Sequence, residues 1–343
     1  MSLSNKSPSG VAVEKFLIAH SAQGLDISRW LDTLISNNRN FENSKVMAYR
    51  MLTKAGVPMP ASTPFNGIDQ LKQLVQRPFP FVVKFDSSYL FGIQTVVVRN
   101  ETDLAQVYAS SELIHSTRGI VQDFCQGKEY TVVALVGSQN WISLGTAVDY
   151  KRVSEHAQSL NSFGMGSMSP CTYTAPDTMA VVDLVAQTIR TNFKFRGVLC
   201  CQFLLDTASN LWFLEYNMRF CDSESQSILP SLGPEAARAL VQLYHDEPMQ
   251  PVPNHNVNAV TVCLVNQHWP EPQQNRAELV LDANPFDVAL CHSVFDLNYD
   301  LNTYWGSITN SGPGTHAQLA QEVYDFLQTQ NLGPYRYRID IGQ

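Results

Sequence analysis

The sequence lacks any hydrophobic run long enough to cross a membrane. Its apolar runs, such as Leu184–Val185–Ala186, fall far short of the roughly 20 residues that a spanning helix needs. No positively charged and then apolar leader opens the chain, so secretion is not expected. The chain also lacks a cluster of basic residues. Its 23 Lys and Arg against 31 Asp and Glu give a net charge of −8, which argues against a nucleic-acid-binding surface.

Zinc-binding spacings and familiar nucleophile motifs are missing too. The seven cysteines form no CxxC pair, and several lie in apolar segments, where a free thiol behaves as a small hydrophobic group. No GxSxG, P-loop or HExxH motif occurs, and the eight histidines form no metal pair or Ser/His/Asp order. These absences leave a protein of the reducing cytoplasm whose chemistry does not depend on an activated Ser or Cys.

What is present is a globular pattern of alternating strands and helices. With 343 residues, 44% apolar and 16% charged, the chain is long enough for two or three compact units. Residues 1–10 are small and polar and are expected to be disordered. The mixture of elements predicts an α+β or mixed α/β protein. Predicted helices cover 44–54, 69–76, 101–109, 178–193, 235–244 and 315–329, and predicted strands cover 78–84, 96–98, 120–124, 130–136 and 260–265.

The most informative segment is 211–226, LWFLEYNMRFCDSESQ. The apolar run 211–214 predicts a buried strand, and Glu215, Asn217 and Arg219 alternate after it with Tyr216 and Met218. Side chains at i and i+2 of a strand share a face, so a carboxylate, an amide and a guanidinium would point the same way. Hard oxygen ligands and a forked cation suit Mg²⁺-nucleotide phosphate chemistry. The alternative is a half-exposed strand that turns polar side chains to solvent.

A second apolar strand precedes this one. Residues 198–206 are apolar except for Gln202 before the final Asp206, and 207–210 form a turn-like connection. The two strands predict a hairpin in which Gln202 lies near Glu215 and Asn217.

This hairpin resembles the metal-binding strand pair of the ATP-grasp superfamily. The closest pattern is that of glycinamide ribonucleotide synthetase (phosphoribosylamine–glycine ligase), in which the run reads LEFN-x-RFGDPETQ and this chain reads LEYNMRFCDSESQ. Counterparts follow in the same order along the chain at 44–45, 81–86, 149–153, 161–170 and 335–342. Gln202 is more like carbamoyl phosphate synthetase, where a glutamine at that place joins the metal shell.

The resemblance implies an α+β ATP-grasp fold, in which two α+β subdomains clasp ATP, with a small, mostly β C-terminal domain. It implies a partly disordered extension with short helices at 1–43, the ATP-grasp domain at 44–245, a linker at 246–258 and the C-terminal domain at 259–343. The family's N-terminal Rossmann-like domain has no equivalent in the 43 residues before Ser44.

The resemblance also assigns roles to residues that face the nucleotide and the metal. Lys84 ends a buried strand and matches the lysine that contacts the α/β-phosphates, although a snorkelling lysine at a strand end is the alternative. Lys45 matches a second nucleotide-facing basic residue, or is an ordinary first-turn lysine. The backbone of Gln122, Asp123 and Phe124 matches the adenine-binding hinge, and Glu129 matches the acid that binds the ribose. The implied metal ligands are Gln202, Glu215 and Asn217, for Mg²⁺ or Mn²⁺.

On the substrate side, Lys151, Arg152 and Arg219 correspond to cations that offset phosphate charge, with a surface charge cluster as the alternative for Lys151 and Arg152. The implied substrate-binding residues are Asp149, Asn161, Gly164, Met165, Gly166, Asp222 and Glu224. Phe163 replaces the first Gly of the family's NTGGMG loop.

The largest departure from the family lies between Lys84 and Val96. The family's phosphate loop is rich in Gly, Ala and Lys, whereas residues 87–95 here contain one glycine and no lysine. Two hypotheses follow. One is an ATP-dependent carboxylate–amine ligase that acts through an acyl phosphate on small molecules, with an amino acid as the expected substrate class and without a nucleic-acid or membrane partner. The sequence leaves its oligomeric state open, with a dimer as one alternative. The other is a nucleotide-binding pseudoenzyme that serves as a regulator or scaffold.

Overall fold

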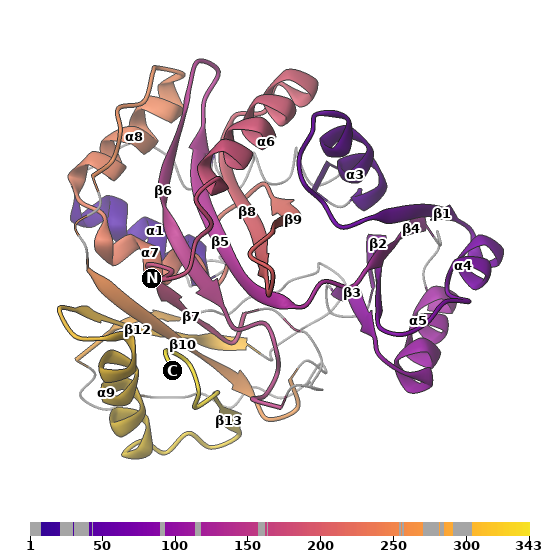
Figure 1. Cartoon of the computed structure of the whole chain (residues 1–343). Coiled ribbons are helices and arrows are strands. Elements are labelled where there is room, and N and C mark those ends of the chain that lie inside the picture. Colours follow the sequence, from indigo (N-terminus) through magenta and orange to yellow (C-terminus); the bar gives the residue numbers. More distant parts are fainter. Residues whose placement is uncertain are drawn as a thin grey trace.

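Two antiparallel sheets with helices packed on them make up the protein (Figure 1). The computed structural model describes residues 8–20, 30, 41–42, 44–89, 93–113, 118–156, 162, 164–253, 255, 257–269, 281, 285–290 and 304–343. Antiparallel strands with helices outside them confirm the predicted α+β class. Among the described residues, no helix has the length and apolar character that a bilayer crossing requires.

The large sheet has nine strands in the order β11-β12-β10-β7-β6-β5-β8-β9, and β13 also pairs with β10. Its strands are β5 (Gly127–Val136), β6 (Trp141–Asp149), β7 (Gly166–Ser169), β8 (Gly197–Asp206), β9 (Leu211–Asn217), β10 (Asn258–Asn266), β11 (Asp287–Leu290), β12 (Tyr304–Gly312) and β13 (Tyr335–Arg336). The β8–β9 hairpin is the one that the sequence predicts, and its register pairs Gln202 with Glu215.

Alternate side chains of β5 and β8 contribute to two separate hydrophobic cores, one on each face of the large sheet. Tyr130, Val132, Leu199 and Cys201 point toward α6 (Thr178–Phe193), whereas Val133 and its neighbours on the other face pack against three helices. Those helices are α1 (Pro8–Ala19), α7 (Glu224–Ile228) and α8 (Pro234–His245), followed after α7 by the short helix η1 (Leu229–Ser231). Both faces are therefore covered, which explains why these strands are almost continuously apolar.

The small sheet stands to one side of the large one (Figure 1). Its order is β1-β4-β2-β3, from β1 (Ser62–Asn66), β2 (Phe81–Tyr89), β3 (Ile93–Val98) and β4 (Arg118–Asp123). The helices α4 (Ile68–Leu74) and α5 (Glu101–Leu113) cover one face and enclose a core of its own. Helix α3 (Lys45–Lys54) contacts β2 and β4 of this sheet and α6 of the larger unit.

The C-terminal segment extends the large sheet. β10 pairs with β7, and α9 (His316–Gln328) packs on β10 and β12. The division into 1–43, 44–245, 246–258 and 259–343 remains a proposal, because the β7–β10 pairing joins the two larger segments in one sheet. The expected disorder of residues 1–10 is wrong for 8–10, which begin α1; residues 1–7 lie outside the described residues.

Several elements differ from the sequence-based expectation. Strands β1, β6 and β7 and helix α7 were not predicted. Residues 87–95, predicted to be the phosphate loop, largely extend β2 and β3, and Tyr89 pairs with Ile93; residues 90–92 lie outside the described residues. The sequence of apolar and polar residues there fits a strand pair, in agreement with the absence of a glycine-rich pattern.

Candidate functional site

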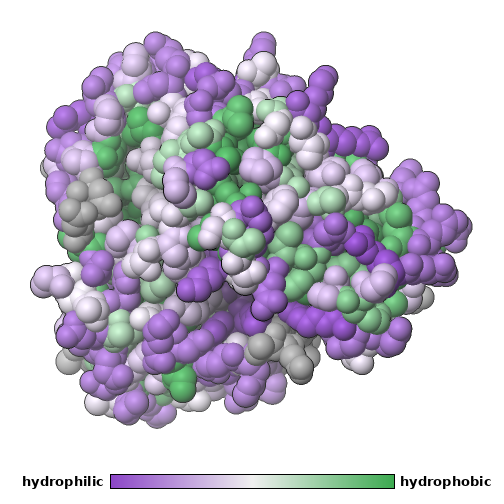
Figure 2. Space-filling model, viewed as in Figure 1, coloured by the Kyte–Doolittle hydropathy of each residue, from purple (hydrophilic) through white to green (hydrophobic). Residues whose placement is uncertain are grey.

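One face of the large sheet changes from apolar to polar toward the start of β5. Thr131 on β5 pairs with Gln202 on β8, and Gln202 pairs with Glu215 on β9, so the three side chains form a row on one face. Val133 and Cys200, one step along the same face, belong to the hydrophobic core. Figure 2 shows hydrophilic side chains around a hollow near the middle of the molecular face.

Glu215 and Asn217 point to the same side of β9. Glu215 pairs with Gln202 and Asn217 pairs with Cys200, and these partners are themselves two residues apart. The register shift beside Gln202 accommodates Leu214 without reversing this arrangement. Gln202 and Asn217 are largely buried and the side chain of Glu215 is 23% exposed, so the face holds two buried amides and one partly buried carboxylate.

Two lysines from the small-sheet side reach this strand. The Nζ of Lys45, in the first turn of α3, lies 3.1 Å from Oε2 of Glu215. The Nζ of Lys84, on β2, donates a 3.0 Å hydrogen bond to the carbonyl oxygen of Leu214. Lys84 is only 4% exposed, so it does not extend to bulk solvent as a snorkelling lysine would.

A third lysine approaches from the end of β6. The Nζ of Lys151 donates to Oε1 of Gln202 at 2.7 Å and pairs with Oε2 of Glu129 at 3.0 Å. Burial opposes its charge, but Glu129, Asp149 and Glu215 outweigh burial and hold the pKa of Lys151 above its usual range. Lys151 is therefore positively charged and lies next to Gln202 and Glu215, two of the predicted metal ligands.

The mutual charges set the protonation of the other groups. Burial alone would raise the pKa of Glu215, but Lys45, Lys84 and Lys151 hold that pKa well below its usual range. Burial lowers the pKa of Lys84 to about 8; Glu215 opposes this shift, and Lys45 and Lys151 add to it. The site therefore contains an ionised Glu215 surrounded by an excess of positive charge.

Arg219 lies beyond β9, which ends at Asn217, so strand alternation does not determine its direction. Its Nε lies 3.1 Å from Oε1 of Glu42, and the other oxygen of Glu42 accepts the backbone N–H of Met218 at 2.9 Å. Burial opposes the charge of Arg219, but Glu42 holds its pKa above the usual range. Glu42 is a partner that sequence reasoning missed, since nothing local connects residues so distant in the chain.

Two of the residues predicted to bind substrate, Asp149 and Glu224, carry carboxyl groups that are shielded from solvent. Oε1 of Glu224 accepts a 3.1 Å hydrogen bond from Thr131, and Glu224 is 1% exposed. Burial and the charge of Glu224 raise the pKa of Asp149, and burial raises the pKa of Glu224. Asp222 lies at the same turn, where its Oδ1 accepts from Gln226 at 3.1 Å. Thr131 was not predicted as a site residue.

The segment 164–166 lies between this turn and the C-terminal unit. A Cβ on Gly164 would lie 2.6 Å from Oδ1 of Asp149, so only glycine fits beside that carboxyl group. Met165 is fully buried against Cys263 and Trp269. A Cβ on Gly166 would lie 2.6 Å from the carbonyl oxygen of Thr261, which gives this glycine a role in sheet packing. Asn161 and Phe163 lie outside the described residues.

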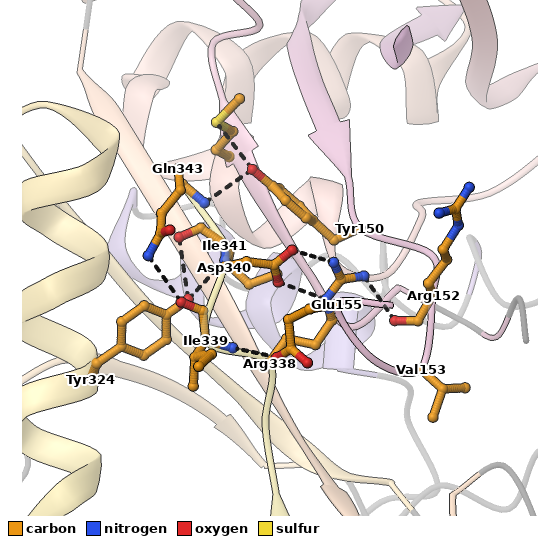
Figure 3. A network of polar contacts seen from close by, with 12 residues as sticks. Tyr150, Arg152, Val153, Glu155, Tyr324, Arg338, Ile339, Asp340, Ile341 and Gln343 are labelled. Carbon is orange, nitrogen blue, oxygen red and sulfur yellow. Dashed lines mark hydrogen bonds and ion pairs between the residues drawn. The ribbon is translucent and has the colours of Figure 1, made fainter. Parts of the chain in front are cut away.

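The residues predicted to face adenine and ribose lie at the end of β4 and near the start of β5. Gln122 is buried and donates from Nε2 to Ser62 Oγ at 2.9 Å, Asp123 pairs with Arg77, and Phe124 is exposed. Glu129 begins the same row of β5 that holds Thr131. The side chain of Arg152 points away from the network in Figure 3, to which its backbone carbonyl belongs. Burial, with the charge of Arg99, lowers the pKa of Arg152.

The donor set fits a hard divalent cation. Glu215, Asn217 and Gln202 offer carboxylate and amide oxygens on one face, which are ligands that Mg²⁺ accepts. Lys45 on Glu215 and Lys151 on Gln202 show that this face already attracts positive charge. Within the described parts of the chain, no three His, Cys, Asp or Glu side chains form a metal cluster, so such a site depends on the amides.

Residues 43–225 match the family described as phosphoribosylglycinamide synthetase, ATP-grasp (A) domain. This chain belongs to that family. The resemblance predicted from the hairpin is therefore confirmed, and so is the enzyme class at the level of the family, whose named relatives are C–N ligases.

Relatives match along most of the chain. The phosphoribosylamine–glycine ligase of Synechocystis sp. is 29% identical over 321 residues, which cover 88% of this chain and 75% of the relative. The Listeria monocytogenes protein of the same name is 28% identical over 327 residues, with 90% and 77% covered.

Solved structures confirm the predicted ATP-grasp fold. The crystal structure of phosphoribosylamine–glycine ligase from Thermotoga maritima has a TM-score of 0.74 at 22% identity and covers 88% of this chain and 79% of that one. Biotin carboxylase from Campylobacter jejuni, in complex with β-γ-ATP, has a TM-score of 0.61 at 13% identity, with 87% and 68% covered. Identities this low establish the fold alone.

Proposed function

We propose that this protein is an ATP-dependent carboxylate–amine ligase that forms an amide through an acyl phosphate. The observation that carries the proposal is the convergence of Lys45, Lys84 and Lys151 around Glu215, on the hairpin that also carries Gln202 and Asn217. Cations around hard oxygen ligands are what a triphosphate with a divalent cation requires.

In this proposal, the small sheet and the large sheet each hold a part of the nucleotide. Lys45 and Lys84 bind phosphate oxygens, the backbone of 122–124 borders the adenine, and Glu129 binds the ribose. Glu215, Asn217 and Gln202 would hold Mg²⁺ or Mn²⁺, which would supply Lewis-acid stabilisation of the phosphate charge. The depressed pKa of Glu215 keeps this carboxylate ionised throughout the physiological range.

The proposed reaction has two steps. A carboxylate oxygen of the substrate bonds to the γ-phosphorus, and the bond from that phosphorus to the β–γ bridging oxygen breaks, which releases ADP. The amine nitrogen then bonds to the acyl carbon, phosphate leaves, and the amine loses a proton. Lys151, Arg152 and Arg219 offset the negative charge on the transferred group, so positioning and electrostatics carry the rate.

An amino acid is the proposed class for one substrate, as in the named relatives, which are glycine ligases. Asp149, Asp222 and Glu224, with the backbone of 164–166 and Asn161, would line the substrate side. Asp149 Oδ1 and Glu224 Oε2 are shielded from solvent and have no hydrogen-bond partner among the described residues, which favours a substrate that brings a hydrogen-bond-donating nitrogen.

A pseudoenzyme that binds nucleotide without turnover is the second candidate. The observation in its favour is the segment 87–95, where β2 and β3 form a strand pair that contains one glycine and no lysine. Fewer backbone amides are then free to wrap a phosphate.

Phosphate release separates the two candidates. The native protein would be incubated with Mg-ATP and pools of amino acids and amines, beside Glu215→Ala and the control Glu247→Ala, an exposed acid outside the site. A ligase releases phosphate only with a substrate pool, retains this activity in Glu247→Ala and loses it in Glu215→Ala. Tight nucleotide binding without turnover under every pool would instead support the pseudoenzyme.

A further inference from the structure

The C-terminal segment 336–342 lies across the segment 150–155 that follows β6 (Figure 3). Arg336 donates to the carbonyl oxygen of Val153 at 3.2 Å, and the backbone N–H of Ile339 donates to Oε1 of Glu155 at 3.0 Å. The backbone N–H of Gly342 donates to the hydroxyl of Tyr150 at 3.1 Å. Contacts therefore run along the whole length of both segments.

Arg338 holds the residues on both sides of Lys151. Its guanidinium carbon lies 5.4 Å from the ring centroid of Tyr150, and its Nη1 donates to the carbonyl oxygen of Arg152 at 2.9 Å. Arg338 is only 6% exposed, so its charge needs a partner. Asp340 provides one, because its Oδ1 accepts a 2.8 Å hydrogen bond from Nε of Arg338. An arginine fits this place because one planar fork makes all these contacts at once.

The segment 150–155 also has anchors outside the C-terminal segment. β6 ends at Asp149, and no helix begins before α6 in the described part of the chain. Backbone hydrogen bonds join Tyr150 to Met165 and Gly166, and Lys151 to Ser162, and Val153 packs against the buried cluster around Met165. The backbone hydrogen bonds hold the start of the segment, and Arg338 holds the carbonyl group of Arg152, immediately beyond Lys151.

Lys151 lies between the two residues that Arg338 contacts. Its ammonium group reaches Gln202 at 2.7 Å and Glu129 at 3.0 Å, one on each of two neighbouring strands. A shift of about 1 Å in the backbone of a catalytic group is enough to reduce a rate up to a hundredfold.

We propose that the segment 336–342 is a C-terminal strap that positions Lys151, with Arg338 as its principal positioning residue. The catalytic part of this inference rests on the proposed ligase function, whereas the mechanical part does not. Arg338 itself touches no predicted nucleotide or metal ligand; it acts through the backbone of residues 150–152.

Hydrogen exchange tests the mechanical part. Arg338→Ala is expected to exchange the amides of 150–155 about tenfold faster than the native protein, while the amides of α6 are unchanged. Arg338→Lys retains the charge without the fork and should fall between the two. Glu155→Ala removes an exposed hydrogen-bond partner of the strap. If Arg338→Ala does not fold, hydrogen exchange is measured in Glu155→Ala instead. Arg238→Ala, an exposed arginine on α8, is the control. Unchanged exchange in 150–155 in the folded strap variants would overturn the proposal.

Kinetics test the catalytic part. In Arg338→Ala, kcat for phosphate release is expected to fall by about tenfold to a hundredfold, with KM for ATP within about twofold of native. In a Lys151→Ala background, Arg338→Ala should cause little further loss, because both changes remove the same contribution. Losses that multiply in full would mean that Arg338 does not act through Lys151 and would overturn its positioning role.

The two parts fail in different ways. If the native protein releases no phosphate with any substrate pool, the ligase function fails, and hydrogen exchange still decides whether the strap holds 150–155. If exchange rises in Arg338→Ala but kcat is native, the ligase function stands and the positioning of Lys151 is refuted.

Discussion

At the scale of single residues, the site is a balance of buried charges. Glu215 remains ionised because lysines surround it, and Lys84 is easier to deprotonate because it is buried. The negative charge of Glu215 balances the charges of these lysines only in part. Phosphate oxygens bound here would therefore stabilise the charged form of each lysine.

Lys84 gives the first prediction. Its pKa is lowered to about 8, so free protein at pH 9 has largely lost this charge, and a bound phosphate would restore it. ADP affinity should therefore fall about tenfold between pH 7 and pH 9, with proton uptake on binding at pH 9. Calorimetric titration in two buffers of different ionisation enthalpy measures both effects. In Lys84→Arg the fall should be largely absent, and an equally steep fall in that variant would refute the assignment.

Glu224 gives the second prediction. Its pKa is raised in the folded state by burial, so the folded protein holds this proton more tightly than the unfolded chain does. Stability contributed by the neutral form is then lost as pH rises through the folded pKa. Glu224→Gln should lose less unfolding free energy than native protein between pH 5 and pH 8, as measured by urea denaturation. A variant whose stability declines with pH as steeply as native would contradict this.

At the scale of elements, the sequence predicts what local patterns determine. The hairpin at 198–217 and helix α6 follow from apolar periodicity and turn residues, and both form as expected. The four-residue β7 could not be predicted, because its pairing with β10 depends on residues about ninety positions away. For the same reason, the contact between Glu42 and Arg219 could not be predicted. The proximity of Gln202 and Glu215 could be predicted, because both residues belong to one hairpin.

Helix α3 gives the third prediction, since its first turn carries Lys45. Ser44 caps the helix by accepting from the backbone N–H of Met47 at 3.4 Å and also donates to Asp86 at 3.1 Å. Ser44→Ala should lower the unfolding free energy by about 1 kcal/mol and weaken ADP binding. Thr315→Ala removes the comparable cap of α9 and should lower stability by a similar amount without changing ADP affinity. Equal ADP affinities in the two variants would argue against a role for α3 in binding.

At the scale of the whole molecule, the candidate site lies where two separately cored units meet. The small sheet encloses its own hydrophobic cluster, and Lys45 and Lys84 extend from its side to β9 of the large sheet. A nucleotide held by both units would therefore join them, and its binding energy would add to the stability of the contact between them.

This arrangement gives the fourth prediction. Mg-ADP at about one hundred times its dissociation constant should stabilise the protein by about 2.7 kcal/mol, with slower hydrogen exchange in both sheets. Glu215→Gln, at the same Mg-ADP concentration, should show a much smaller gain. Stabilisation confined to one unit, or equal in the variant, would contradict binding between the two sheets.

The most direct test is a crystal structure with ADP and Mn²⁺, with the metal located by its anomalous signal. The account predicts a metal peak within about 2.0–2.4 Å of oxygens of Glu215 and Asn217, and phosphate oxygens in contact with Lys45 and Lys84. A well-ordered ADP whose phosphates and metal lie away from Glu215 and Asn217 would contradict it.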